Sequence, residues 1–205
     1  LCLAYIAFGL FERDPWKTDD VVWLATMLSA LDLGGNAWLM PQVGPMALPQ
    51  EGPLVMWTGA GLILLLGSWV GDIAASRITN LVWFSITLWS MWYGTYLLGR
   101  RPEAQPLALP FGGEPTVKDY GRMLADAALL LLLATVGILV RVHETSVVPA
   151  IMAWQALAYY SLARMLDKPL QGATTLGVAL ACAFLTRAWP GTLPILLAVP
   201  LAFRP

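Results

Sequence analysis

The chain has 205 residues, of which 58% are hydrophobic and 12% are charged, and its net charge is −1. Soluble domains carry about 25% charged residues, so this composition argues against a soluble protein, and the balanced charge gives no reason to expect nucleic acid as a partner. Ten Trp and six Tyr are typical of the aromatic belts at membrane interfaces. We therefore expect an integral membrane protein. It should be all-α, because helices satisfy their backbone polar groups within one segment in lipid.

Apolar windows near the length of a membrane span, about 20 residues, define the predicted elements. Residues 1–11 form the end of a first span, and residues 12–77 form an outer loop with juxtamembrane helices. The chain begins at Leu1 inside an apolar run, so we expect residues 1–205 to be a single membrane domain and a fragment of a longer protein. The remaining predicted transmembrane helices are 78–99, 120–140, 147–165, 170–186 and 190–203.

The window 52–71 has two interpretations. It contains five glycines, and it either spans the membrane or lies in the interface as a juxtamembrane helix. Lys and Arg concentrate in cytoplasmic loops, and the loop 99–122 carries three Arg and one Lys. If 52–71 does not span, the basic loops are all cytoplasmic, and residues 12–77 share the outer side with the loops 141–146 and 186–191. The charge bias favours this interpretation, with an interfacial helix over 53–68.

Several short motifs with charged residues follow one another along the chain. The pair Asp19–Asp20, in "KTDDVVWLATML", opens the outer loop. "WLMP" follows about twenty residues later, and "PQEGPLVMW" places Glu51 just before the interfacial window. Arg77, in "AASRITN", stands immediately before the predicted span 78–99. The two later outer loops carry His143 and Glu144, in "RVHETS", and Arg187, in "FLTRAWPG".

This series of motifs resembles the N-terminal membrane half of the polyprenyl-phosphate-sugar-dependent glycosyltransferases. That family includes the dolichyl-phosphate-mannose protein mannosyltransferases and the bacterial lipid A aminoarabinose transferases. The resemblance covers most of the chain and implies a polytopic transmembrane helical bundle of the GT-C type. Three positions depart from the family pattern: Gln50–Gly52 lacks the family's Lys, Glu144 stands where the family has Asp, and Arg187 stands where it has Lys.

The resemblance also implies an enzyme, a glycosyltransferase similar to family 39. It would move a sugar from a polyprenyl-phosphate donor to the hydroxyl of a lipid or protein acceptor. The expected location is the bacterial inner membrane, with the active site facing the periplasm. The reaction needs a base near the acceptor hydroxyl and positive charge near the leaving phosphate. The expected catalytic residues are Asp19, Asp20 and Glu144, and the expected substrate-binding residues are His143, Arg187, Glu51 and Arg77.

The same charged residues are also compatible with purely structural roles. Acids in the first turn of a helix after Thr18 favour the positive end of the helix dipole, and Arg187 can reach the interface by snorkelling. A divalent metal is an open question, because one His with a few carboxylates is not a metal signature. The alternative functions are a polytopic transporter or flippase-like protein and a non-catalytic membrane subunit. A transporter is expected to carry charges near the midpoints of its spans, whereas here they stand mostly near span ends.

Overall fold

The computed structural model describes residues 2–11, 14–107 and 110–202. Over these ranges the protein is mostly helical (77%), with eight α-helices, so the prediction of a helical protein is confirmed. The only sheet in this part of the chain is one antiparallel pair of two-residue strands, β1 (Gln42–Val43) and β2 (Met46–Ala47). The two short 3-10 helices are η1 (Gly35–Trp38) and η2 (Pro102–Ala104).

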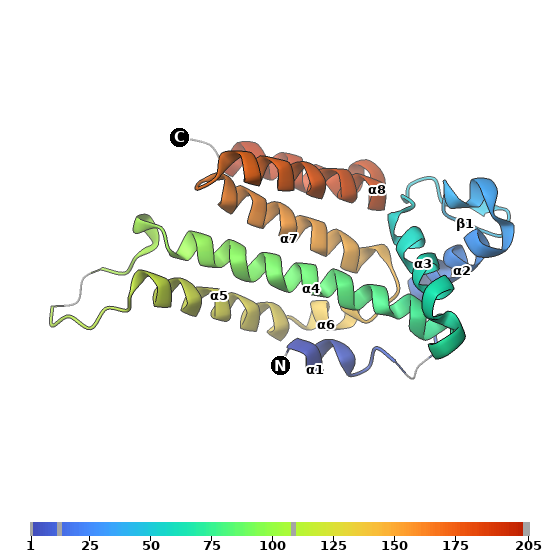
Figure 1. Ribbon diagram of the computed structural model, residues 1–205, viewed down its shortest axis with the longest axis horizontal. Helices are drawn as coiled ribbons and strands as arrows, with labels where there is room; N and C mark the ends of the chain where they lie inside the picture. The colour runs from blue at the N-terminus through green and yellow to red at the C-terminus, as the bar shows by residue number, and fades with distance from the viewer. Residues whose placement is uncertain (1, 12–13, 108–109, 203–205) are drawn as a thin grey trace.

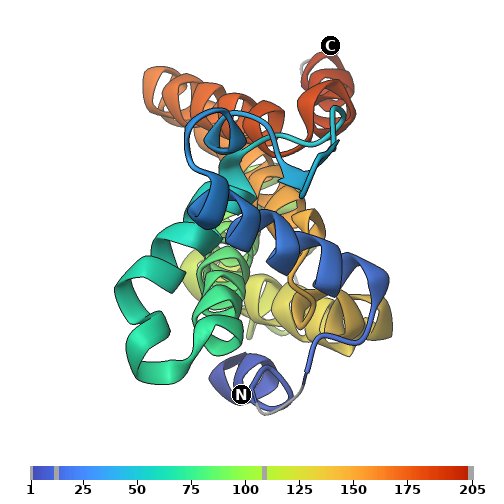
Figure 2. The ribbon, with the colours of Figure 1, turned by 90° about the vertical axis from the view of Figure 1, so that its right-hand side faces the viewer.

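The α-helices form an elongated bundle with a cap at one end (Figure 1). Helices α4, α5, α7 and α8 lie alongside one another, while α2, α3 and the β1–β2 hairpin gather at one end, which we call the α2–α3 end. Figure 2 views the molecule from that end. The bounds are α1 (Cys2–Ala7), α2 (Thr18–Leu33), α3 (Leu54–Val70), α4 (Asp72–Gly99), α5 (Val117–Ala134), α6 (Val136–Val142), α7 (Val147–Met165) and α8 (Pro169–Ala202).

Helix boundaries differ from the sequence prediction at two places. Helix α4 begins at Asp72 rather than at residue 78, so Arg77 lies inside it. The predicted single helix over 120–140 is wrong, because α5 and α6 meet at an angle of 73°. Between them Thr135 is extended, with ψ at 104°, and its hydroxyl donates to the carbonyl of Leu131 at 2.9 Å. Such a side-chain bond offers the backbone an alternative to the helix.

Helix α8 is a helical hairpin rather than a straight rod. Its backbone leaves the helical region at Arg187 (φ −149°, ψ 44°) and Ala188 (φ 39°, ψ −138°). A Cβ placed on Gly191 would lie 2.6 Å from the carbonyl oxygen of Ala183, eight residues earlier. In a straight helix those residues would be about 12 Å apart. The chain therefore reverses at the break, as Figures 1 and 2 show, and the two arms occupy the ranges predicted as 170–186 and 190–203. Residue 203 lies outside the described residues.

Few of the described helices are both long enough and apolar enough to cross a membrane. In the described part of the chain α8 meets both conditions when its 34 residues are taken together across the break, and α5 with α6 does so only if the bent pair counts as one span. Helix α3 is apolar but has 17 residues. A span of about 30 Å needs about 20 residues, so α3 is short for crossing a membrane upright.

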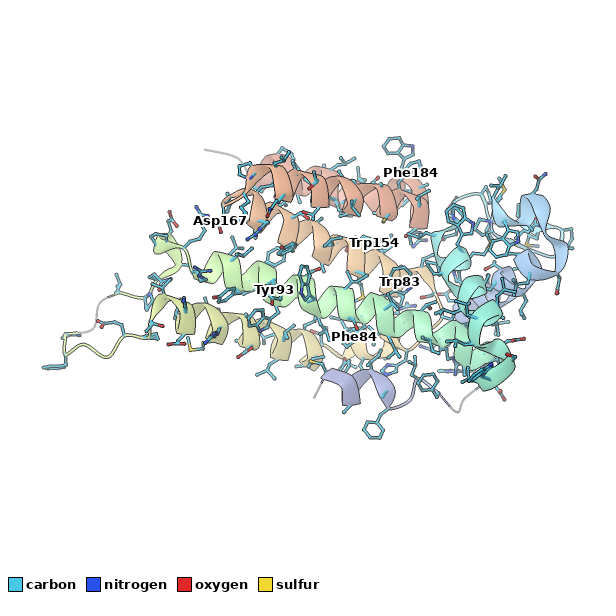
Figure 3. The ribbon with its side chains drawn as sticks, in the orientation of Figure 1. Trp83, Phe84, Tyr93, Trp154, Asp167 and Phe184 are labelled. Atoms are coloured by element: carbon cyan, nitrogen blue, oxygen red, sulfur yellow. The ribbon has the colours of Figure 1, made fainter. Side chains whose placement is uncertain are left out.

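Helix α4 occupies the middle of the bundle and presents aromatic side chains to two neighbours. Trp83 meets Trp154 of α7 edge to face, with ring centroids 5.3 Å apart (Figure 3). The next residue, Phe84, stacks on Tyr5 of α1 at 5.6 Å. Buried alanines of α7 and α8, including Ala153 and Ala183, complete the main core cluster. The large aromatic surfaces thus anchor α4, while small residues serve the contact between α7 and α8.

Replacing Ala188 by Gly is expected to stabilise the protein by about 1 kcal/mol. A non-glycine residue at φ 39° holds backbone strain of about 1–3 kcal/mol, which glycine relieves at some cost in chain entropy. The melting temperature in detergent measures the effect. The matched control is Ala198→Gly in the helical second arm, which is expected to destabilise by about 1 kcal/mol. If both substitutions lower the melting temperature equally, the strain at Ala188 is absent.

Candidate functional site

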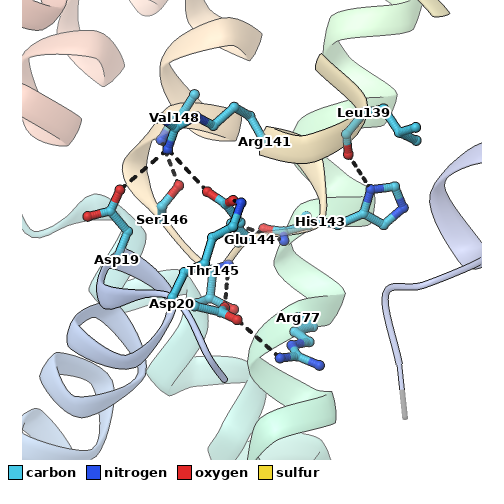
Figure 4. Close-up of polar contacts among 12 residues, drawn as sticks. Asp19, Asp20, Arg77, Leu139, Arg141, His143, Glu144, Thr145, Ser146 and Val148 are labelled. Carbon is cyan, nitrogen blue, oxygen red and sulfur yellow. Dashed lines mark hydrogen bonds and ion pairs between the residues drawn. The ribbon is translucent and has the colours of Figure 1, made fainter. Parts of the chain in front are cut away.

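A buried ion pair joins four segments at the α2–α3 end (Figure 4). Asp20, in the first turn of α2, accepts a hydrogen bond at Oδ2 from Nη2 of Arg77 at 3.2 Å, and both side chains are 1% exposed. The other oxygen of Asp20 accepts from the backbone N–H of Thr145 at 2.8 Å. Nη1 of Arg77 donates to the carbonyl of Leu10 at 3.2 Å. The pair thus connects the segment after α1, helices α2 and α4, and the loop between α6 and α7.

Glu144 stands beside this ion pair on the α6–α7 loop. Its side chain is 1% exposed, and it forms ion pairs with Nζ of Lys17 and, at 3.2 Å, with Nη1 of Arg141. Its backbone carbonyl accepts from Nδ2 of Asn80 at 3.0 Å. A buried carboxylate is costly unless charged or polar partners surround it, and these two cations provide that compensation. Glu144 is therefore a fixed negative charge between two positive ones.

Asp19 differs from Asp20 in its exposure. Its side chain is 58% exposed and lies 3.5 Å from Nη1 of Arg141, the guanidinium that also contacts Glu144. It borders an open cavity of about 420 Å³, which we call the Asp19 cavity. The residues lining it are Trp16, Lys17, Thr18, Asp19, Arg141 and Glu144. Asp19 thus presents an exposed carboxylate to a cavity that Lys17 and Arg141 also line.

A second ion pair joins the outer loop to the turn of α8. Glu51 lies 3.4 Å from Nε of Arg187, and the backbone N–H of Gly52 donates to the carbonyl of Thr186 at 2.9 Å. The backbones approach so closely that a Cβ on Gly52 would lie 2.0 Å from the carbonyl oxygen of Leu185. Burial raises the pKa of Glu51; Arg187 opposes this shift, and the negative charge of Asp19 adds to it. Glu51 therefore lies within electrostatic reach of the Asp19 cavity.

The raised pKa of Glu51 predicts a pH-dependent stability. At a pH just above 4.5, the ordinary pKa of this carboxyl group, Glu51 holds a proton in the folded protein that it has released in the unfolded chain. Stability therefore falls as the pH rises from that value through the higher pKa of the folded state. We expect the melting temperature of wild type, relative to Glu51→Gln, to decline over this window and then level off. The control is Glu103→Gln, whose carboxylate is 76% exposed. A flat difference between wild type and Glu51→Gln would contradict the prediction.

None of the four predicted substrate-binding residues lines the Asp19 cavity, and His143 and Arg77 have other surroundings. His143 is buried, its Nδ1 is 2.6 Å from the carbonyl oxygen of Leu139, and its ring lies 6.3 Å from that of Tyr5. Arg77 borders another cavity, of about 350 Å³, together with Asp72. Within the described residues, no three His, Cys, Asp or Glu side chains group as a metal-binding set. Asp19, Asp20, Glu51 and Glu144 are instead engaged by Lys and Arg.

Three residues of the site were not predicted from the sequence: Lys17, Arg141 and Asn80. Lys17 lies two positions before Asp19, and Arg141 lies two before His143, so proximity to the acidic motifs was a usable signal for both. Asn80 lies within an apolar segment of α4, and only its contact with the Glu144 carbonyl marks it.

The arrangement is thus a balanced cluster: three carboxylates, Asp19, Asp20 and Glu144, lie among three cations, Lys17, Arg77 and Arg141. One carboxylate is exposed and two are buried.

Comparison of the chain with protein-family models, with curated proteins and with solved structures gives no match.

Proposed function

We propose that the chain is the membrane part of a glycosyltransferase that takes its sugar from a polyprenyl-phosphate donor. The observation that supports this most directly is the Asp19 cavity, where an exposed carboxylate lies beside Arg141 and Lys17. Transfer to a hydroxyl needs a base and a positively charged place for the leaving phosphate within one site. The acceptor is a lipid or protein hydroxyl.

In the proposed reaction, the acceptor oxygen forms a bond with the anomeric carbon of the sugar while the bond from that carbon to the phosphate oxygen breaks. Asp19 receives the proton of the acceptor hydroxyl. The lipid phosphate leaves with the bonding electrons, and Arg141 and Lys17 stabilise its charge through charge-assisted hydrogen bonds. Arg141 now contacts two carboxylates, so an arriving phosphate would compete with Asp19 for it and release Asp19 to act as base.

The buried residues have supporting roles in this proposal. Asp20 and Arg77 are nearly inaccessible, so we assign them to holding α2 against α4 rather than to contact with substrate. Glu144 keeps Lys17 and Arg141 in place. Arg187 is half exposed and paired with Glu51, and it is the second candidate contact for the lipid phosphate.

The proposal includes a polytopic bundle of the GT-C type in a bacterial inner membrane. The apolar hairpin α8, the apolar helix α3 and the side-by-side helices α4 and α7 support it. Its outer face would be the α2–α3 end, where the balanced cluster of carboxylates and cations lies. No nucleic acid is part of the proposal, and a divalent metal is not needed for the steps above.

Incorporation of labelled sugar tests the proposed function. Membranes containing the protein are supplied with polyprenyl-phosphate-linked sugars, and label transferred to lipid or protein is measured. The proposal expects transfer that depends on the protein and disappears with free sugar phosphate as donor. Lipid-linked donor moved across the membrane without covalent transfer would instead support a flippase-like protein.

A further inference from the structure

Basic side chains also gather at the end of the bundle opposite the α2–α3 end. Arg100 and Arg101 follow the last residue of α4, and Asp167 lies in the turn between α7 and α8, labelled in Figure 3. Together with Leu97 and Pro102 they line a cavity of about 190 Å³, which we call the Arg100 pocket. None of the steps proposed at the Asp19 cavity uses it.

Arg100 is held in position by packing rather than by a carboxylate. Its guanidinium lies 5.2 Å from the centre of the Tyr96 ring, a cation–π distance. Its aliphatic stem lies against α5, where a Cβ on Gly121 would come within 2.8 Å of Cγ of Arg100. No carboxylate among the described residues forms an ion pair with Arg100. Its charge is therefore fixed in direction and available to an anion.

Arg101 is paired, but its partners are exchangeable. It lies 3.4 Å from Asp167 and 3.6 Å from Glu103, and the Glu103 carboxylate is 76% exposed. Exposed ion pairs of this kind contribute about 0–1 kcal/mol, whereas a guanidinium binds phosphate through two parallel hydrogen bonds. Two further cations, Arg164 and Lys168, flank Asp167 in the sequence. These four cations and the two carboxylates, Asp167 and Glu103, sum to a charge of +2.

A purely structural role accounts for only part of this arrangement. Cations after a helix favour the negative end of its dipole, and Arg side chains snorkel to interfaces. Neither effect requires a cavity between two guanidinium groups. An exposed apolar side chain also stands at this end, since Leu170, in the first turn of α8, is 79% exposed. A ligand with an anionic group and an apolar tail would match both features.

We propose that the Arg100 pocket binds the phosphodiester headgroup of an anionic phospholipid from the leaflet at this end. Arg100 and Arg101 contact the phosphate oxygens, and the acyl chains run along the helices past Leu170. Basic pockets between membrane helices on the cytoplasmic side bind such headgroups in general. The inference depends on the chain lying in a membrane and is independent of sugar transfer at the Asp19 cavity.

The experiment measures phosphatidylglycerol retained by the whole chain after extraction from vesicles of phosphatidylcholine mixed with phosphatidylglycerol, by native mass spectrometry. One basic side chain near a membrane surface contributes about a fivefold change in binding, so Arg100→Gln is expected to retain about fivefold less. Asp167→Asn is expected to retain more, because it removes the carboxylate that competes for Arg101. This opposite sign separates the effect from a loss of folding. The control is Arg122→Gln, a 61% exposed arginine of α5, which is expected to match wild type.

Three results would overturn the proposal. Equal losses in Arg100→Gln and Arg122→Gln would show that surface charge in general, and not the pocket, retains the lipid. Unchanged or lower retention in Asp167→Asn would remove the role of Arg101. Displacement of the lipid by inorganic phosphate alone would identify the pocket as a site for free phosphate. Sugar transfer is measured separately, so a failure here leaves the proposed function standing.

Discussion

Asp19→Asn is expected to reduce sugar transfer by about 10²–10⁴-fold, the usual contribution of a general base, with almost no change in stability. Asn keeps the shape of the side chain but cannot accept the proton of the acceptor hydroxyl. The side chain is 58% exposed and its contact with Arg141 is 3.5 Å long, so its loss should cost no more than about 1 kcal/mol. Initial rates of label transfer and melting temperatures, measured on the same preparations, check both parts.

The control for Asp19→Asn is Asp32→Asn. Asp32 is an exposed carboxylate near the other end of α2, so this variant changes the charge of the same helix without touching the Asp19 cavity. It is expected to transfer sugar at the wild-type rate. An Asp19→Asn protein with wild-type activity would defeat the assignment of the base. If that variant lost activity and melted far below wild type, Asp19 would instead have the structural role expected of an acid in the first turn of a helix.

The adjacent substitution, Asp20→Asn, is expected to have its largest effect on stability, about 3–5 kcal/mol, as found when one partner of a buried ion pair is removed. For a chain of about this length, that loss lowers the melting temperature by roughly ten degrees. The reason is burial: Asp20 and Arg77 are both 1% exposed, so water cannot replace the missing carboxylate. Thermal unfolding of Asp19→Asn and Asp20→Asn side by side compares two neighbouring carboxylates that differ in exposure.

The double variant Asp20→Leu with Arg77→Met makes the second prediction sharper. Replacing both members of a buried ion pair by apolar residues is often nearly neutral, so it is expected to be more stable than Asp20→Asn. The backbone N–H of Thr145 then loses its acceptor on Asp20, which limits the recovery by about 1–3 kcal/mol. Equal melting temperatures for Asp19→Asn and Asp20→Asn would show that the ion pair contributes little to folding.

The helical class and several helix positions follow from the amino-acid sequence without any knowledge of packing. Long apolar windows with few charges dictate helices, and the segment 147–165 coincides with α7 because Ser146 caps its first turn, accepting from the N–H of Val148 at 3.3 Å. Asp19 and Asp20 also lie in the first turn of α2, which begins at Thr18, where acids favour the positive end of the helix dipole. These features depend on neighbours in the chain, so a local pattern is sufficient to find them.

The different roles within the acidic pair arise from packing and could not be read from the sequence. Asp19 and Asp20 are adjacent and chemically identical, yet one is exposed beside Arg141 and the other is buried against Arg77. Consecutive residues on a helix point about 100° apart, and the side that becomes buried depends on where α4 packs. The bend at Thr135 and the close approach of Gly52 to α8 are similar cases. Each depends on segments far apart in the sequence, and the packing of those segments fixes which charges meet.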